Sequence, residues 1–156
     1  MSKLIKSEKR IENIRKSGEI LSSVLKKLAK EVKPGVKPID LDALSRKLIE
    51  EAGGTPAFLG YKPEGALHPF PFALCSSVND VIVHGRPSDT ALKEGDIITL
   101  DLGVDWRGGI SDAAITVPVG KISKNAQLLI ELTRGALNKA LEQVKPGKTL
   151  GDIGHA

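Results

Sequence analysis

The tetrapeptide Val-Lys-Pro-Gly occurs twice in this chain of 156 residues, at positions 32–35 and again at 144–147. Each copy follows a long amphipathic segment, and after each copy the chain resumes with an isoleucine beside an acidic residue. Because proline and glycine end helices, both places have the pattern of a helix, a stop and a second helix. A unit that recurs together with its context indicates a fold built from two copies of one structural unit.

The positions of the two copies predict the domain organisation. A first pseudo-repeat covers about residues 1–120, and the second begins near Ser123 and continues over 123–156. The second copy should need about as many residues as the first, but the sequence ends at Ala156. We therefore expect residues 1–156 to form a single incomplete domain whose second half is truncated.

Hydrophobic spacing predicts three helices and several short strands. The first helix, about 8–32, has an apolar stripe that starts at Ile11 and is spaced alternately three and four residues apart. The second helix begins with Asp40 as its N-cap, and the third covers about 124–144. Residues 54–75 are rich in Gly and Pro and predict a long irregular loop. Extended segments are expected at 73–78, 81–84, 97–104 and 110–119, with a hairpin connection at 105–109.

Composition excludes several classes of protein. Hydrophobic residues are 40% and charged residues 27% of the chain, which is ordinary for a globular protein with its own core. One Trp, one Tyr and three Phe are too few for a stacking platform on single-stranded nucleic acid. The single cysteine, Cys75, excludes an internal disulfide and fits a reducing, cytoplasmic setting. No apolar run is long enough to cross a membrane, and residues 1–16 do not form a secretory signal.

Positive charge is concentrated near the N-terminus. Residues 1–37 contain eleven Lys or Arg against four Glu, a balance of +7, whereas the whole chain has +4. Such a face can attract a polyanion such as RNA. A solvated helix surface is the simpler interpretation, because acidic residues are interleaved and no recognition motif accompanies the charge.

Two aspartates lie in the apolar strands on either side of the predicted hairpin. If the hairpin is centred on Trp106 and Arg107, Asp101 and Asp112 lie opposite each other, with Cβ atoms about 5 Å apart. Two ionised carboxylates at that distance repel each other. The repulsion is relieved if one carboxylate is protonated, if a cation lies between them, or if both face solvent. A divalent metal relieves it best, so the pair is a candidate metal site.

A histidine and the single cysteine are further candidates. His84 ends the predicted strand 81–84 and precedes Gly85, so it can face a cleft as a general acid or base or as a metal ligand. A lone histidine is also common as a purely structural residue. Cys75, beside Ala73 and Leu74, is expected to be buried rather than reactive.

Four segments of the chain resemble type I methionine aminopeptidases. They are Thr55–Tyr61, Asn79–Pro87, Gly95–Asp101 and the pair Ser111-Asp112, and they occur in the family's order and spacing. The resemblance implies an α+β pita-bread (creatinase/aminopeptidase) fold, here with its first half complete and its second half truncated. It also implies a cytoplasmic metalloexopeptidase that removes the initiator methionine from nascent polypeptide N-termini. Two divalent metal ions (Co, Mn, Fe or Zn) would serve as cofactors, and the ribosome surface is a further expected partner, with no membrane or specific DNA partner.

The resemblance also assigns roles to individual residues. Asp101 and Asp112 would be metal ligands, and His84 would contact the scissile amide and help to transfer its proton. Phe58, Tyr61 and Cys75 fall where the family forms its pocket for the methionine side chain, and His84 also touches the substrate. The family completes its site with one His and two Glu from the second half, and none of these is present in this sequence. We therefore expect the chain by itself to be inactive.

Two departures keep alternatives open. Ser111 and Ala113 flank Asp112 where methionine aminopeptidases usually have Gly and Thr, and the Ser-Asp pair is reminiscent of Xaa-Pro aminopeptidases. The segment 62–72 is longer than is usual in the family, at the place where the pocket rim would lie. The alternatives are an Xaa-Pro-type metalloaminopeptidase and a non-catalytic pita-bread homologue that binds the ribosome or RNA.

Overall fold

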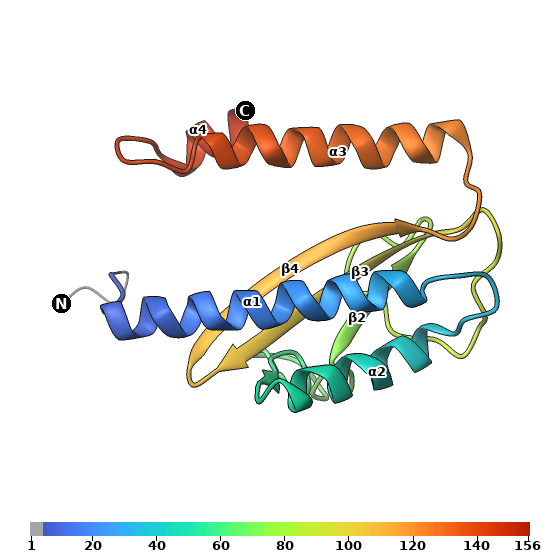
Figure 1. Ribbon diagram of the computed structural model, residues 1–156, viewed down its shortest axis with the longest axis horizontal. Coiled ribbons are helices and arrows are strands. Elements are labelled where there is room, and N and C mark those ends of the chain that lie inside the picture. Colours follow the sequence, from blue (N-terminus) through green and yellow to red (C-terminus); the bar gives the residue numbers. More distant parts are fainter. Residues whose placement is uncertain (1–4) are drawn as a thin grey trace. The chain divides into compact units, whose positions relative to one another are not determined.

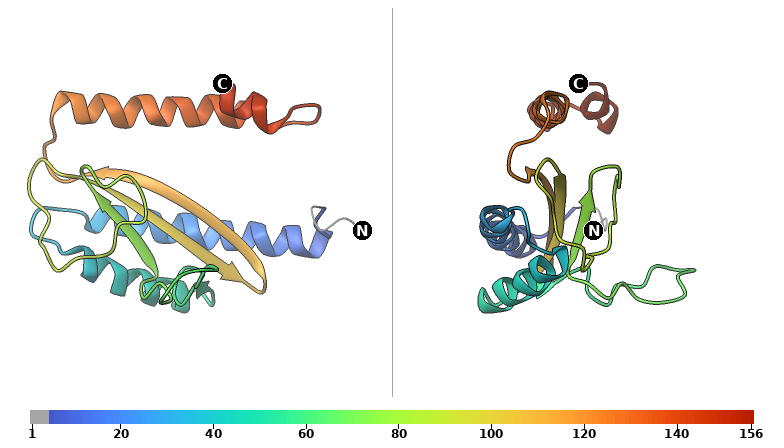
Figure 2. Two further views of the ribbon diagram at one scale, coloured as in Figure 1. Left: turned by 180° about the vertical axis from the view of Figure 1, so that it is seen from behind. Right: turned by 90° about the vertical axis from the view of Figure 1, so that its right-hand side faces the viewer.

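The computed structural model describes residues 5–156, which form two compact units that divide between Lys121 and Ile122. Residues 1–4, which include Lys3 of the basic N-terminal segment, lie outside the described residues. The first unit contains two helices and a four-stranded antiparallel sheet, and the second contains two helices (Figures 1 and 2). The α+β composition is confirmed. That the units are two copies of one repeat stays a prediction.

Helices α1 (Glu8–Glu31) and α2 (Pro38–Glu51) cover one face of the sheet (Figure 2, right). The N-terminus of α1 is capped by the Ser7 hydroxyl, which accepts a hydrogen bond from Arg10 N. The predicted N-cap at Asp40 is wrong, because α2 begins at Pro38 and its N-cap position is Lys37, three residues earlier. Pro38 occupies the first helical position, where a residue without an N–H leaves no intrahelical hydrogen bond unmade.

The centre of the sheet is β3 (Ile97–Trp106). Strand β4 (Gly109–Pro118) pairs with one edge of β3 along its whole length. Strands β1 (Thr55–Pro56) and β2 (Leu74–Val78) both pair with the other edge of β3. Side chains alternate along β3, and the four that point toward the helices are completely buried: Ile98, Leu100, Leu102 and Val104. The opposite face of β3 therefore presents the odd-numbered residues, which include Asp101.

Two sequence predictions in this unit are wrong. Residues 81–84 do not form a strand, because the chain after β2 turns at Asn79 and Asp80 and continues as irregular structure. The predicted loop 54–75 contains the short strand β1, which adds to β3 at Val104 and Asp105. The rest of that loop projects from the sheet (Figure 2, right).

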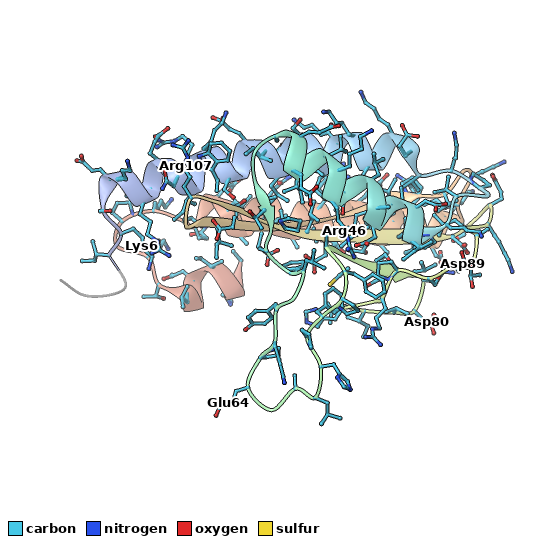
Figure 3. The ribbon with its side chains drawn as sticks, turned by 90° about the horizontal axis from the view of Figure 1, so that it is seen from below. Lys6, Arg46, Glu64, Asp80, Asp89 and Arg107 are labelled. Atoms are coloured by element: carbon cyan, nitrogen blue, oxygen red, sulfur yellow. The ribbon has the colours of Figure 1, made fainter. Side chains whose placement is uncertain are left out.

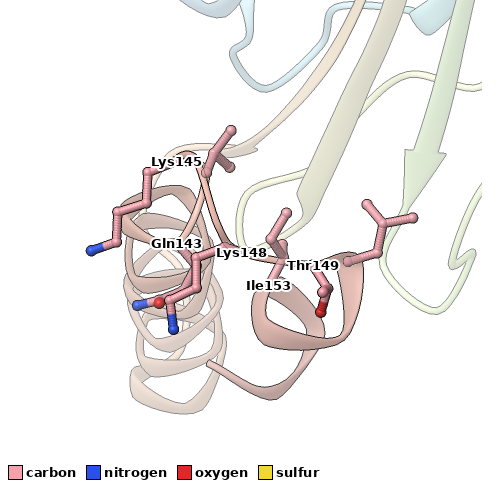
Figure 4. A pocket seen from close by; sticks show the side chains of 7 residues that line it. Gln143, Lys145, Lys148, Thr149 and Ile153 are labelled. Carbon is pink, nitrogen blue, oxygen red and sulfur yellow. The ribbon is translucent and has the colours of Figure 1, made fainter. Parts of the chain in front are cut away.

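The second unit consists of α3 (Lys124–Glu142) and α4 (Leu150–His155). Ser123 caps α3 by accepting from Ala126 N, and Thr149 and Asp152 form a reciprocal capping box at α4. An open hollow beside the turn between the two helices is lined by residues such as Gln143, Lys148 and Ile153 (Figure 4). No residue of α3 is buried in the structure, so the leucines of this helix are exposed: Leu128, Leu129, Leu132, Leu137 and Leu141.

Among the described residues, no helix is both long enough and apolar enough to span a membrane.

Candidate metal centre

Asp101 and Asp112 lie on the same face of the sheet, opposite the helices. The predicted register is wrong by two residues, because Asp101 pairs with Ala114 and Asp112 pairs with Gly103. The two carboxylates are therefore diagonal neighbours, at positions about 7–8 Å apart in a regular antiparallel pair.

The hairpin turn explains the shifted register. The strands continue to Trp106 and Gly109, which leaves only Arg107 and Gly108 in the turn. Both turn residues have positive φ values, of 50° and 81°, as in the two-residue turns whose twist matches that of paired strands. The centre of the hairpin therefore lies one residue later than the sequence analysis assumed.

The electrostatics of the pair match a cation site. Burial raises the pKa of Asp101 above its ordinary value of 3.8, the negative charge of Asp112 raises this pKa further, and His84 opposes the shift. Within the described residues, no Lys or Arg forms an ion pair with either carboxylate. A half-buried carboxylate that lies beside a second carboxylate and has no Lys or Arg partner is a donor set that a divalent ion stabilises.

Cys75 is the direct cross-strand neighbour of Asp101 on β2. Its side chain is buried, and burial raises the pKa of its thiol to about 11, with Asp101 and Asp112 adding to the shift. At neutral pH in the absence of metal the thiol is therefore protonated. It acts as part of an apolar wall and not as a nucleophile.

His84 reaches the same place from the irregular segment after β2. Its backbone has a positive φ of 57°, which is uncommon for a residue with a side chain. The next residue, Gly85, donates from its N–H to Ser77 Oγ at 3.2 Å and accepts from Ser76 N at 2.8 Å. The segment is thus tied to β2, and potential ligand atoms of Cys75, His84 and Asp101 lie within 4.8 Å of one another.

The predicted pocket residues are not all placed together. Phe58 lies against Gly103 of β3, where a Cβ atom would be 2.7 Å from Phe58 Cε1. Its ring is therefore next to the strand position that pairs with Asp112. Tyr61 is 62% exposed at the base of the projecting loop, whose tip at Glu64 points away from the sheet (Figure 3). The structure thus brings Phe58 and Cys75 to the candidate site and leaves the side chain of Tyr61 largely in solvent.

A pair of hydroxyl groups that the sequence did not predict holds β4 against α1. The buried Ser17 on α1 donates to Val104 O at 2.7 Å, and its Oγ lies 2.6 Å from Ser111 Oγ. Because Ser17 uses its proton on the carbonyl, Ser111 donates to Ser17. Ser111 departs from the family pattern, and its hydrogen bond to Ser17 holds β4 in place directly beside Asp112. A small polar residue on the inner stripe of a helix was the signal that could have revealed this contact.

Aspartate and histidine side chains gathered in this way are of the kinds that bind divalent metal ions. A model of metallopeptidase family M24 matches residues 12–156, and the chain belongs to this family. It has the pita-bread fold that the resemblance implied, and membership of the family implies the use of divalent metal.

Known relatives support the same assignment. The methionine aminopeptidase of Aquifex aeolicus is 47% identical over 148 residues, which are 94% of this chain and 57% of that protein. The crystal structure of methionine aminopeptidase from Rickettsia prowazekii aligns with a TM-score of 0.90 at 35% identity, over 97% of this chain and 58% of that one. Prolidase from Pyrococcus furiosus aligns with a TM-score of 0.78 at 25% identity, over 96% of this chain and 41% of that one. The chain thus spans less than two thirds of the length of these relatives.

Proposed function

We propose that the protein containing this chain removes the N-terminal methionine from nascent polypeptides by metal-dependent hydrolysis. The observation that most supports this proposal is the presence of Asp101 and Asp112 on one sheet face, with His84 held beside Asp101. Identity of up to 47% to proteins named methionine aminopeptidase favours this substrate over the alternatives.

In this proposal each residue of the site has a separate task. Asp101 and Asp112 would hold two divalent ions, chosen among Co, Mn, Fe and Zn. Divalent ions held by carboxylates supply a water nucleophile at neutral pH. His84 would hydrogen-bond the scissile amide and transfer its proton. Phe58 and Cys75 would form apolar walls that suit a thioether side chain, and Tyr61 would belong to the same pocket.

The chain by itself is expected to be inactive. The resemblance assigns one His and two Glu to a second half of the fold, and two carboxylates cannot complete the coordination of two ions. We therefore propose activity for a polypeptide that carries this chain together with the remaining segment of its relatives. Its expected setting is the cytoplasm, near the ribosome, where nascent N-termini emerge.

A peptidase assay on that longer polypeptide tests the proposal. We expect hydrolysis of Met-Gly-Met after addition of divalent metal, and loss of that activity with a chelator. Asp101→Asn and Asp112→Asn should each lower kcat/KM by at least about 100-fold, because each removes a metal ligand. Asp89→Asn is the matched control, since Asp89 is a surface residue that pairs with Lys37.

The same assay separates the alternatives. Hydrolysis of a Gly-Pro peptide in place of Met-Gly-Met would indicate an Xaa-Pro aminopeptidase. Binding of ribosomal RNA without metal and without peptidase activity would indicate the non-catalytic alternative.

His84 has a test of its own. Replacing His84 by Ala should lower kcat far more than it lowers the affinity of the Asp101 and Asp112 carboxylates for Mn²⁺. Equal losses in both quantities would contradict the proposed role in proton transfer.

A further inference from the structure

Three metal-binding side chains from three different segments converge beside the proposed pair of carboxylates. The Cys75 Sγ atom, a nitrogen of the His84 ring and a carboxylate oxygen of Asp101 all lie within 4.8 Å of one another. They come from β2, from the irregular segment after β2, and from β3. Asp112, the other carboxylate of the proposed pair, does not belong to this group.

We propose that Cys75, His84 and Asp101 form a second metal site, which binds one soft divalent ion such as Zn²⁺ or Cd²⁺ and thereby inhibits the enzyme. The inhibition rests on the function proposed above, because it requires an active dinuclear centre. The binding of the soft ion does not, since it needs only these three side chains.

The three groups lie close enough together to reach one zinc ion after a small movement. Zinc binds Cys sulfur at about 2.3 Å and His nitrogen or carboxylate oxygen at about 2.0–2.2 Å, which places neighbouring ligand atoms roughly 3.3–3.8 Å apart. Since the three atoms lie within 4.8 Å of one another, each pair needs to approach by at most about 1.5 Å. His84 is exposed, so its ring has room for that movement, and solvent can supply the fourth ligand.

The thiol gives this site its selectivity. Thiolate ligands select soft ions such as Zn²⁺ and Cd²⁺, whereas Mn²⁺ prefers oxygen ligands. On binding, the S–H bond of Cys75 breaks, the sulfur–metal bond forms, and one proton is released to solvent without any change of oxidation state.

Occupation of this site excludes the arrangement proposed for catalysis. Asp101 is shared by the two sites, so an ion held by Cys75 withdraws this carboxylate from the pair formed with Asp112. The same ion ties up the His84 ring, which then cannot reach the substrate amide. A soft ion in excess is therefore inhibitory, whereas Mn²⁺ is not.

Cobalt absorption of this chain tests the binding directly. Cys75 is the only cysteine, so a sulfur-to-cobalt charge-transfer band in the near ultraviolet reports this one side chain. We expect the reduced chain to develop the band on titration with Co²⁺ and to release one proton per bound ion. Zn²⁺ or Cd²⁺ should abolish the band, and Mn²⁺ at the same concentration should leave it in place.

Single substitutions then identify the ligands. Cys75→Ser and Cys75→Ala should remove the band, and His84→Gln and Asp101→Asn should each weaken Co²⁺ binding by at least about tenfold. Asp112→Asn is the matched control, because it removes a ligand of the proposed pair but should preserve the band. Fluorescence of Trp106, the only tryptophan, verifies that each variant is folded.

The proposal is overturned if the reduced wild-type chain shows no sulfur–cobalt band. It is also overturned if the band survives both His84→Gln and Asp101→Asn, or if it requires Asp112. If the band behaves as expected but the longer polypeptide hydrolyses no methionyl peptide, the soft-metal site stands and the proposed function fails separately.

Discussion

At the residue scale, the position of His84 depends on the absence of a side chain at Gly85. A Cβ atom there would lie 2.2 Å from Ser76 O, well inside van der Waals contact with the backbone of β2. The two hydrogen bonds between Gly85 and β2 require this close approach. Gly85 lies in the segment 79–87, which resembles the family. The sequence does not show, however, that its backbone must lie in contact with β2.

Gly85→Ala should therefore destabilise the first unit. We expect a loss of about 1–3 kcal/mol in the free energy of unfolding, because the added methyl group forces the segment away from β2. Urea denaturation followed by Trp106 fluorescence measures it. Gly18→Ala is the control, since Gly18 is helical with no atom within 4 Å of its Cβ position, and it should stabilise the protein by about 0.5–1 kcal/mol. An unchanged midpoint for Gly85→Ala would show that the tie to β2 is dispensable.

Asp42 is a second residue whose importance is visible only in the structure. Its side chain is 3% exposed, and Oδ1 accepts hydrogen bonds from the N–H groups of Ala73 and Leu74, which lead into β2. Oδ2 accepts from Arg46, which also donates to Pro71 O. This carboxylate thus holds the start of the strand that contains Cys75.

Asp42→Ala should lower the free energy of unfolding by about 3 kcal/mol or more, because it leaves buried N–H donors and a partly buried guanidinium without their acceptor. Thermal unfolding observed by circular dichroism gives the comparison. The control is Asp40→Ala, an exposed residue in the first turn of the same helix, which should cost less than about 1 kcal/mol. Equal losses for the two variants would contradict the role assigned to Asp42.

At the scale of elements, hydrogen bonds of the Asn79 and Asp96 side chains hold together the two ends of the connection from β2 to β3. Asn79, with φ of 54°, donates from Nδ2 to Asp96 Oδ1 at 2.9 Å and accepts from Ile97 N at its own Oδ1. Asp96 Oδ2 accepts from Lys93 N at 2.8 Å. The hydrogen bond from Asn79, followed by that from Lys93 N, lowers the pKa of Asp96 below its ordinary value of 3.8.

This lowered pKa predicts a pH dependence of stability. The ionised carboxylate is favoured in the folded state, so its contribution is present above the unfolded-state pKa and is lost as the pH falls through the folded-state value. Asp96→Asn should therefore be less stable than wild type at neutral pH, and the difference should shrink below about pH 3.8. Urea denaturation of both proteins over that range tests this. Glu64→Gln, at the tip of the projecting loop, controls for the loss of one negative charge. A difference that stays constant with pH would be evidence against the Asn79–Asp96 contact.

At the scale of the whole molecule, the second unit has little core of its own. The apolar stripe of α3 includes Leu132, 64% exposed, and Leu137, 56% exposed. Contiguous exposed apolar surface of this kind promotes association.

We therefore expect the 156-residue chain to self-associate at micromolar concentrations and to be sparingly soluble. Replacing Leu132 and Leu137 together by Lys should shift sedimentation toward the monomer without changing the unfolding midpoint of the first unit. Matched substitutions at Gln127 and Asn138, which are polar positions of the same helix, should leave the association unchanged. A wild-type chain that sediments as a monomer and melts cooperatively would contradict this expectation.

The sequence by itself determined the local features of this protein. Helical spacing, the Val-Lys-Pro-Gly stops and the alternation around Asp101 and Asp112 depend on residues that are close in the chain, so they could be interpreted without a structure. The tertiary structure decided the rest. The diagonal placement of the two carboxylates follows from the backbone angles of Arg107 and Gly108. The position of His84 beside Asp101 follows from the contact of Gly85 with β2. The first property depends on the conformation of a turn and the second on a contact between two backbones, and hydrophobic periodicity encodes neither.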